Sequence, residues 1–356
     1  MKPILTLLPT LLLAPLAMAS TVGMSVQATD GSWKKMPSIP DEQGFAGSFA
    51  GVSGGALLVA GGANFSGDVK TWSEEVFILE SPEAVWRVAG KLPGPLGYGV
   101  SVTYGDALLC IGGSDATQHH RKVLCLRWRR GALEKSELAP LPRALANACG
   151  AVVGDELYIA GGLHAPDATN AASVFWVLDL SKPGAAWREL ESWPGPARMM
   201  ATAGTFDGSF FLFGGAGLKT GADGKPERLW FRDGYRFKPG AGWSRIADLP
   251  RSVVASPSPA FAASPGHLWI LGGDDGTQLA VPPEEHKGFP KDILVYDAHA
   301  DRWSMAGEVP FSLVTTAAVL WDGNLVIPGG EQRPRIRSNE VWRGTFSSAS
   351  RKDGTR

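Results

Sequence analysis

The chain has 356 residues, with 34 Lys and Arg against 35 Asp and Glu, and it contains 45 Gly, 26 Pro and 13 Trp. Because there is no basic surplus, the charge balance argues against a nucleic-acid partner. A chain of this length ordinarily forms about two domains, but this composition, with little helical periodicity, is typical of many short strands joined by turns.

The N-terminus has the pattern of a secretory signal peptide. It carries one cation at Lys2, an apolar stretch over residues 4–16 and the small-residue end Ala17-Met18-Ala19, which together predict cleavage of residues 1–19. The apolar stretch is shorter than the roughly 18–20 residues that cross a bilayer, and no later segment approaches that length. We therefore expect a periplasmic or secreted protein that does not span a membrane, and the sequence leaves open which compartment receives it.

The rest of the chain contains an internal repeat. A glycine pair closes an apolar run six times, at spacings of 51, 49, 53, 58 and 57 residues. The pairs are Gly61-Gly62, Gly112-Gly113, Gly161-Gly162, Gly214-Gly215, Gly272-Gly273 and Gly329-Gly330. Repeats of about 50 residues are typical of arrays in which each unit is one small sheet.

A tryptophan marks the same repeat in a second place. It lies six residues before an apolar-Pro pair at Trp33, Trp86, Trp187, Trp243 and Trp303. The second copy of the repeat has Lys135 at this position. A large, rigid, apolar ring that recurs once per repeat is suited to pack between neighbouring units.

Each repeat contains four predicted strands, and its length resembles the kelch repeat, which forms one four-stranded propeller blade. The strands are nearly continuous apolar runs, as expected for sheets that are buried on both faces. The sequence therefore predicts an all-β, six-bladed kelch-type β-propeller.

The phase of the repeat also predicts how the ring closes. The segment Ser32–Ile39 has the tryptophan pattern but no preceding strands, and the last repeat lacks a tryptophan strand. We expect the N-terminal strand to complete the sixth blade, which would remove a free sheet edge. The predicted organisation is a single propeller domain over residues 20–346, followed by a polar tail over 347–356.

The three cysteines are too few and too odd in number for a disulfide framework. Cys110, Cys125 and Cys149 all lie in apolar runs, which favours buried free thiols. A bridge between Cys110 and Cys125 remains an alternative in an oxidising compartment. We assign none of them a catalytic role.

The segments that follow the glycine pairs differ widely although the strands repeat, so the function is sought there. The sixth segment opens with Glu331 and continues with Arg333, Arg335 and Arg337. It is the one that joins a potential base directly to several cations. In the first segment, Asn64 and Phe65 are candidate sugar contacts on the expected channel face.

The motif "GGE-x-x-P-x-x-R", the signal peptide and the six blades together resemble the N-acetylneuraminate (sialic acid) epimerase, or mutarotase, family, and in particular its circularly permuted members. The resemblance implies that Glu331 is the proton acceptor and that Arg337 is its active-site partner. It also implies a substrate contact for Arg198, in "WPGPARMM". The chain departs from the family pattern at Leu96, where members often have Arg.

The resemblance implies isomerisation of a sugar acid without a metal or redox cofactor. Mutarotation removes the anomeric hydroxyl proton and protonates the ring oxygen, so one carboxylate can serve as general base. A guanidinium can hold the substrate carboxylate through two hydrogen bonds. Because an Arg that touches Glu331 would weaken it as a base, we expect at least one of Arg333, Arg335 and Arg337 to face the substrate instead.

Two other classes of protein remain open. A non-catalytic propeller that binds a glycan or a protein would use the same face. Kelch-type copper-radical oxidases need a Tyr, Cys and His ligand set, which the sequence does not display. The neighbouring His119 and His120 would point to opposite faces of a strand, Asp274 and Asp275 are expected to cap a turn, and no metal site is predicted. The sequence leaves the exact sugar and the oligomeric state open.

Overall fold

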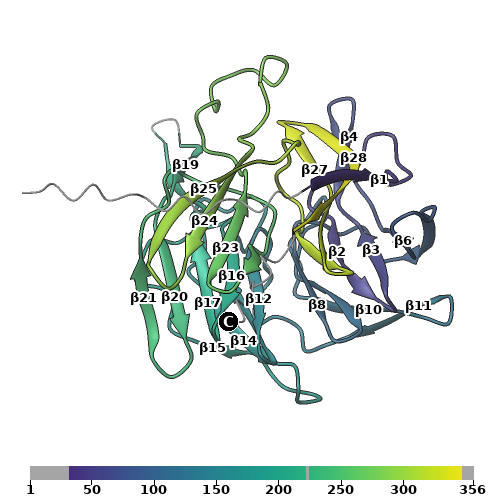
Figure 1. Ribbon diagram of the computed structural model, residues 1–356, viewed down its shortest axis with the longest axis horizontal. Coiled ribbons are helices and arrows are strands. Elements are labelled where there is room, and N and C mark those ends of the chain that lie inside the picture. The colour runs from purple at the N-terminus through teal and green to yellow at the C-terminus, as the bar shows by residue number, and fades with distance from the viewer. Residues whose placement is uncertain (1–31, 222–223, 347–356) are drawn as a thin grey trace, which may run out of the picture.

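The computed structural model describes residues 32–221 and 224–346. Within these ranges the regular elements are β-strands, and six four-stranded antiparallel sheets form a six-bladed β-propeller (Figure 1). The predicted fold class is therefore confirmed. The predicted signal peptide and polar tail lie outside the described residues, and the described part of the chain has no helix long and apolar enough to cross a membrane.

The first three blades follow one another along the chain. Blade 1 consists of β2 (Phe49–Ser53), β3 (Ala56–Ala60), β6 (Glu75–Leu79) and β7 (Arg87–Lys91). Blade 2 consists of β8 (Val100–Tyr104), β9 (Ala107–Ile111), β10 (Val123–Arg129) and β11 (Ala132–Glu137). Blade 3 consists of β12 (Cys149–Val153), β13 (Glu156–Ala160), β14 (Phe175–Asp179) and β15 (Arg188–Glu189).

Blades 4 and 5 continue the series, and blade 6 uses both ends of the described chain. Blade 4 consists of β16 (Thr202–Phe206), β17 (Ser209–Phe213), β20 (Gly234–Lys238) and β21 (Gly242–Ile246). Blade 5 consists of β22 (Phe261–Ser264), β23 (His267–Leu271), β24 (Asp292–Asp297) and β25 (Arg302–Glu308). Blade 6 consists of β26 (Val319–Trp321), β27 (Asn324–Arg333), β28 (Ile336–Thr345) and β1 (Ser32–Met36).

The ring closes as the sequence predicted. Strand β1 pairs with β28, from Ser32 opposite Thr345 to Met36 opposite Val341, and Figure 1 shows the purple first strand beside the yellow last one. The ring of Trp33 packs edge-on against Phe311, with 5.1 Å between the ring centroids. Blade 6 therefore has four strands like the others, and β1 covers the edge of β28 that would otherwise be unpaired.

A closed cycle of backbone hydrogen bonds surrounds the central channel. One residue per blade, at the head of the innermost strand, donates its N–H to the carbonyl of the equivalent residue in the preceding blade, at 2.7–2.8 Å. All six have a positive φ. They are Gly47, Tyr98, Asn147, Met200, Ala255 and Thr315. This cycle holds the six strand heads at one level, so side chains at equivalent positions reach the same height above the channel.

The hydrophobic core is divided among the interfaces between blades. Each of the six large clusters of buried side chains draws on two neighbouring blades; one combines Phe49 and Leu58 of blade 1 with Leu108 and Leu124 of blade 2. Strand β3 is buried at every position. This arrangement explains why the strands are continuous apolar runs: both faces of each sheet are covered.

Both residues of every glycine pair have a positive φ, a conformation that other residues adopt at a cost. Close approach of the next blade adds a second constraint. A Cβ atom at Gly61 would lie 2.1 Å from the carbonyl oxygen of Leu96. The glycine pair therefore allows the chain to leave one blade while it contacts the following one.

The tryptophans of the repeat join neighbouring blades, as predicted. The indole N–H groups donate to carbonyl oxygens of the preceding repeat, from Trp86 to Pro37, Trp187 to Ala139, Trp243 to Glu191 and Trp303 to Ala247, at 2.7–2.9 Å. In the second repeat, the ammonium of Lys135 donates to the carbonyl of Lys91 at 2.9 Å, and so replaces part of this contact. Trp187, Trp243 and Trp303 are only half-buried, because the outer strand faces solvent on one side.

The three cysteines are buried and free. Cys110 lies opposite Leu124, and Cys125 lies opposite Leu109, on the neighbouring strands β9 and β10. The predicted free thiols are therefore observed, and the alternative bridge between Cys110 and Cys125 is not formed.

Candidate active site

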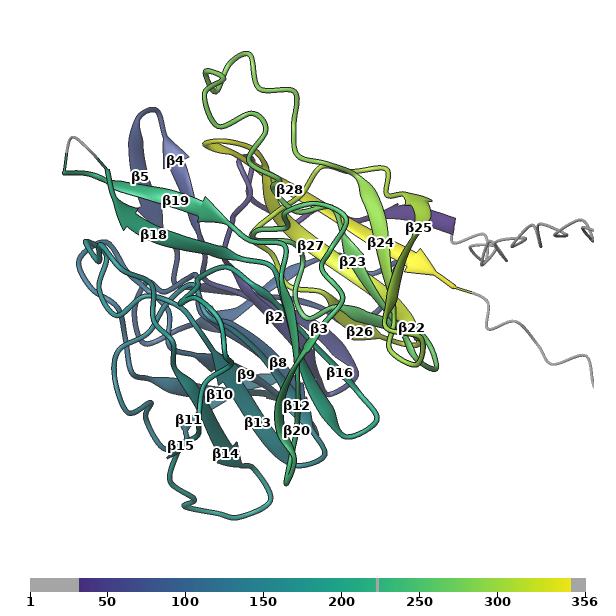
Figure 2. The ribbon, with the colours of Figure 1, turned by 90° about the vertical axis from the view of Figure 1, so that its left-hand side faces the viewer.

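Several extensions project from one face of the propeller, where the chain leaves the glycine pairs. Figure 2 shows the hairpins β4 (Ala63–Ser66)–β5 (Val69–Trp72) and β18 (Ala216–Thr220)–β19 (Pro226–Trp230) on the same side as the outer end of β27 and β28. The long connection that follows β23 rises on this side too. This is the face on which the sequence predicted the functional residues.

The segment that contains Glu331 is a β-hairpin rather than the loop expected from the sequence. Strands β27 and β28 continue past the glycine pair, and Glu331 lies directly opposite Arg337 in the register. Arg335, with a φ of 69°, lies in the turn. The register shifts on both sides of Glu331, and such bulges redirect side chains locally. Cross-strand pairing therefore brings the predicted base and the predicted cation together.

Glu331 and Arg337 form an ion pair that leaves hydrogen-bonding capacity unused. Oε1 of Glu331 lies 2.5 Å from Nη1 of Arg337 and accepts the backbone N–H of Arg335 at 2.9 Å. The side chain of Arg337 is 5% exposed; its Nη1 is held by Glu331, whereas its Nε has no hydrogen-bond acceptor among the described residues. Buried donors without acceptors are costly, so this guanidinium is suited to receive an anionic ligand.

Aromatic side chains from blades 1 and 2 line the other side of Arg337. Its guanidinium lies 5.0 Å from the ring centroid of Phe65, and Nη2 donates to the hydroxyl of Tyr98 at 3.4 Å. The ammonium of Lys70 lies 4.4 Å from the ring of Trp72 and 4.1 Å from that of Tyr98. Two cations therefore approach the same group of rings.

The surroundings of Lys70 and Tyr98 shift the pKa values of both side chains. Lys70 as a whole is exposed, but desolvation of its ammonium, followed by repulsion from Arg337, lowers its pKa to about 8, although Glu331 acts in the opposite direction. Burial raises the pKa of Tyr98 to about 12, so its hydroxyl keeps its proton at neutral pH. Lys70 therefore titrates just above neutral pH, which is unusual for a lysine.

The remaining residues predicted on these two hairpins lie further out. The side chain of Arg335 is 53% exposed and contacts Asp68, in the turn of the β4–β5 hairpin, at 3.0 Å. Its guanidinium also lies 5.4 Å from the ring of Phe65. Asn64 accepts a hydrogen bond from the hydroxyl of Thr71. Arg335 thus joins the hairpins of blades 6 and 1. Of the three arginines in this segment, Arg337 is the one whose ion pair with Glu331 was described above.

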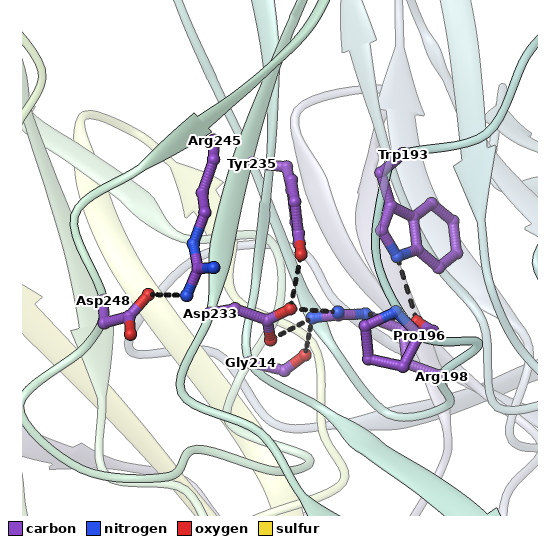
Figure 3. Close-up of polar contacts among 8 residues, drawn as sticks. All are labelled: Trp193, Pro196, Arg198, Gly214, Asp233, Tyr235, Arg245 and Asp248. Atoms are coloured by element: carbon purple, nitrogen blue, oxygen red, sulfur yellow. Dashed lines mark hydrogen bonds and ion pairs between the residues drawn. The ribbon is translucent and has the colours of Figure 1, made fainter.

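Arg198 requires a correction. The structure encloses it completely, and Figure 3 shows its guanidinium held by the carboxylate of Asp233 and the carbonyl of Gly214. The two bonds to Asp233 measure 2.9 and 2.7 Å, and Tyr235 donates to the same carboxylate at 2.7 Å. With no face open to a ligand, Arg198 is a structural residue between blades 3 and 4, not the substrate contact that the resemblance implied.

The repeat explains why Arg198 is buried. It lies two residues before the channel-lining position of its blade, and the five equivalent residues are buried and apolar: Phe45, Leu96, Leu145, Val253 and Leu313. Leu96, the departure from the family pattern, belongs to this set and packs between blades 1 and 2. The departure therefore falls in the core and does not alter the lining of the site.

A cavity of about 450 Å³ opens beside Glu331. It is bounded by the β27–β28 hairpin, the connection after β23, Arg228 of β19, and the channel-lining residues Met200 and Thr315. Asp274 also lines it, although the sequence was interpreted only as placing it in a turn. Its Oδ1 does accept the N–H of Gly276 at 3.0 Å.

Sequence reasoning therefore missed three groups: Lys70, Tyr98 and Asp274. Tyr98 and Asp274 could have been found by aligning the six repeats, because each holds a repeat position that faces the channel mouth. Lys70 carries no such signal, since the β4–β5 hairpin interrupts the repeat.

The comparisons with known proteins point to one family. The model of the N-acetylneuraminate epimerase family matches residues 11–134. A protein named N-acetylneuraminate epimerase from Haemophilus influenzae (strain 86-028NP) is 28% identical over 235 residues, which cover 58% of this chain and 59% of the relative. One of the same name from Yersinia enterocolitica (strain NCTC 13174 / 8081) is 25% identical over 247 residues, 62% of this chain and 61% of the relative.

A third protein of that name, from Yersinia pestis (strain Pestoides F), is 28% identical over 230 residues, which cover 57% of this chain and 56% of the relative. The chain thus spans about three-fifths of the length of these curated relatives. The matches confirm the resemblance that the sequence motifs indicated. The segment matched by the family model includes Asn64, Phe65 and Lys70 and ends before Glu331.

Proposed function

We propose that this protein is a cofactor-independent mutarotase that interconverts the anomers of a keto-sugar acid, most closely N-acetylneuraminate. The observation that carries the proposal is the pair formed by Glu331 and the buried, unsatisfied guanidinium of Arg337 beside an open cavity. The names of the relatives support the choice of sugar. A cavity of about 450 Å³ is also within the range of about 300–1,000 Å³ usual for small-molecule sites.

In this proposal, Arg337 binds the carboxylate of the sugar. A guanidinium matches a carboxylate through parallel N–H groups, and Nε of Arg337 is a donor without a partner among the described residues. Lys70, near the same rings, adds a second positive charge. Phe65 and Trp72 give the sugar ring apolar surfaces to lie against.

Glu331 is the base that accepts the proton of the anomeric hydroxyl. Before substrate binds, Oε1 of Glu331 lies 2.5 Å from Nη1 of Arg337. A substrate carboxylate that shares the same guanidinium competes with Glu331 for this contact, whereas a neutral sugar does not.

The test is the rate of α- to β-anomer conversion of N-acetylneuraminate, followed by NMR with the purified protein. Glu331→Gln keeps the shape and removes the base, so kcat should fall about 10²-fold or more. A neutral aldose such as glucose should also be converted more slowly by this variant, because its anomeric hydroxyl needs the same base. Wild-type conversion no faster than the uncatalysed reaction, together with retained sugar binding, would indicate a glycan-binding propeller instead.

We also propose that the protein acts after export, on the basis of the signal-peptide pattern of residues 1–19. Mass spectrometry of protein recovered from outside the cytoplasm should find a mature chain that begins after Ala19. Recovery of the full-length chain from the cytoplasm would contradict this.

A further inference from the structure

The residue that follows each glycine pair occupies the same place in all six blades. Each forms an isolated antiparallel bridge with a residue just before the innermost strand of its own blade. These six residues are Ala63, Ser114, Leu163, Ala216, Asp274 and Glu331. Asp274 and Glu331 are the ionisable members, and they belong to the neighbouring blades 5 and 6.

The same cavity receives both carboxylates. Asp274 and Glu331 are lining residues of the 450 Å³ cavity, which also contacts the channel-lining residues of blades 4, 5 and 6. The guanidinium of Arg337, 5% exposed and with an Nε that has no acceptor among the described residues, contacts Glu331 and is suited to bind an anionic group beside this cavity. A ligand carboxylate on Arg337 would therefore hold the rest of the sugar close to the entrance of this cavity.

The two carboxylates have opposite surroundings. Glu331 is in contact with the guanidinium of Arg337 at 2.5 Å. Burial raises the pKa of Asp274, and Asp275 adds to the rise, whereas the N–H of Gly276, Arg228 and His286 act against it. One carboxyl group held by a cation and a second whose burial favours the protonated form, on the same cavity, is the arrangement expected for a base and an acid.

We propose that Asp274 is the general acid that works with Glu331 in the reaction described above. This inference rests on the proposed function and adds the second catalytic group that ring opening requires. Asp274 corresponds to no residue of the loop motif that carried the resemblance. It follows from the repeat geometry and from the shared cavity.

The proton transfers balance over the cycle. Glu331 takes the proton of the anomeric hydroxyl, and the electron pair of that O–H bond forms the carbonyl as the bond between the anomeric carbon and the ring oxygen breaks. The ring oxygen takes the proton of Asp274 and becomes a hydroxyl. After rotation about the neighbouring C–C bond, Asp274 takes that proton back during attack on the other face of the carbonyl, and Glu331 returns its own.

The test uses Asp274→Asn in the full-length protein. The amide keeps an oxygen for the N–H of Gly276 and removes the acid, so kcat for N-acetylneuraminate should fall about 10²-fold, with KM changed less than about threefold. Since the proposal needs Asp274 to carry a proton, kcat of the wild-type protein should fall as the pH rises and this proton is lost, and Asp274→Asn should lack that pH dependence. Asp274→Glu should restore part of the rate and of the pH dependence.

Asp275→Asn is the matched control. Asp275 is the next residue and caps the same turn, where its Oδ1 accepts from the N–H of Thr277 at 3.0 Å and from its hydroxyl at 2.8 Å. Its amide variant changes the same charge in the same connection, and the rate should stay within about twofold of wild type.

Three results would overturn the inference. One is a wild-type rate for Asp274→Asn in a protein that Glu331→Gln inactivates; this leaves the proposed function standing. Another is a lower rate with an unchanged pH profile, which would assign Asp274 a structural role. Absence of any anomer conversion by the wild-type protein would overturn the inference and the proposed function together.

Discussion

The blade 3–blade 4 interface and the channel mouth each contain a buried arginine, and the two differ in their partners. Arg198 donates to the carbonyls of Pro196 and Gly214 and to both carboxylate oxygens of Asp233. Arg337 is nearly as well enclosed and its Nη1 pairs with Glu331, but its Nε lacks a hydrogen-bond acceptor among the described residues. The hydrogen-bond network of Arg198 is complete, whereas that of Arg337 leaves a donor available for a ligand.

This difference shows how a structural charge and a functional charge are told apart. Both residues are arginines close to a glycine pair, and both have a carboxylate partner. Burial alone does not separate them. A buried cation whose donors are all satisfied stabilises the fold, whereas unsatisfied buried donors indicate a missing partner. The predictions below test this comparison.

The largest effect is expected at the interface between blades. Arg198→Met should lower the free energy of unfolding by about 3–5 kcal/mol, because it leaves the largely buried carboxylate of Asp233 without its cation and with the hydroxyl of Tyr235 as its remaining side-chain donor among the described residues. Urea denaturation of the purified protein measures this loss. Arg337→Met should cost less than about 1 kcal/mol, since Glu331 keeps access to the cavity. Equal losses of stability for both variants would show that Arg337, like Arg198, has a structural role.

The tryptophan interfaces should show a smaller loss of stability. Trp187→Ala should cost about 2 kcal/mol, below the usual cost for a fully enclosed tryptophan, because the ring is half-buried. Lys135→Ala, at the equivalent position of the second repeat, should cost less than about 0.5 kcal/mol, because its contact is exposed. Urea denaturation of the two variants side by side would show no difference if the indole did not wedge between blades.

At the channel mouth, the effect should be on binding. Arg337→Lys keeps the charge and loses the planar fork, so KM for N-acetylneuraminate should rise about tenfold with a smaller change in kcat. Anomer conversion measured by NMR at several substrate concentrations gives both constants. Glucose is the control and should be converted at an unchanged rate. A fall in kcat at constant KM would instead show that Arg337 stabilises the transition state and not the bound substrate.

The smallest effect should come from Lys70. Its lowered pKa of about 8 means that the ammonium loses its proton as the pH rises through 8, so KM for the acidic sugar should rise by up to about fivefold between pH 7 and 9. Lys70→Met should have the higher KM at both pH values. An identical pH dependence of KM in wild type and variant would show that Lys70 does not contribute to substrate binding.

The lowered pKa of Lys70 also affects stability: the protonated lysine favours substrate binding but disfavours folding. The unfolded chain binds the Lys70 proton more tightly than the folded chain, so Lys70 opposes folding below pH 8. This opposition fades as the pH rises from about 8 towards the unfolded value of 10.5. Lys70→Met should therefore unfold at a slightly higher temperature than wild type at pH 7, and the difference should vanish near pH 10.5.

The sequence by itself determined the number of blades, the closure by the N-terminal strand and the face of the site. These features depend on spacing along the chain: a glycine pair and a tryptophan that recur about every 50 residues define one blade each, and their phase leaves one strand to be supplied by the N-terminus. Through the family resemblance it also gave Glu331 and Arg337 as a candidate pair, and strand pairing across a short turn places these two residues opposite each other.

The tertiary structure alone decided which charges are free to act. Arg198 and Asp233 are 35 residues apart in the chain, and their pairing depends on how blades 3 and 4 pack, which no local pattern reports. Tyr98 and Lys70 reach Arg337 from other blades, and Asp274 shares a cavity with Glu331 because consecutive blades are rotated around one channel. Such contacts depend on the closed ring of backbone hydrogen bonds that sets the strand heads at one level, so they exist only once all six blades are in place.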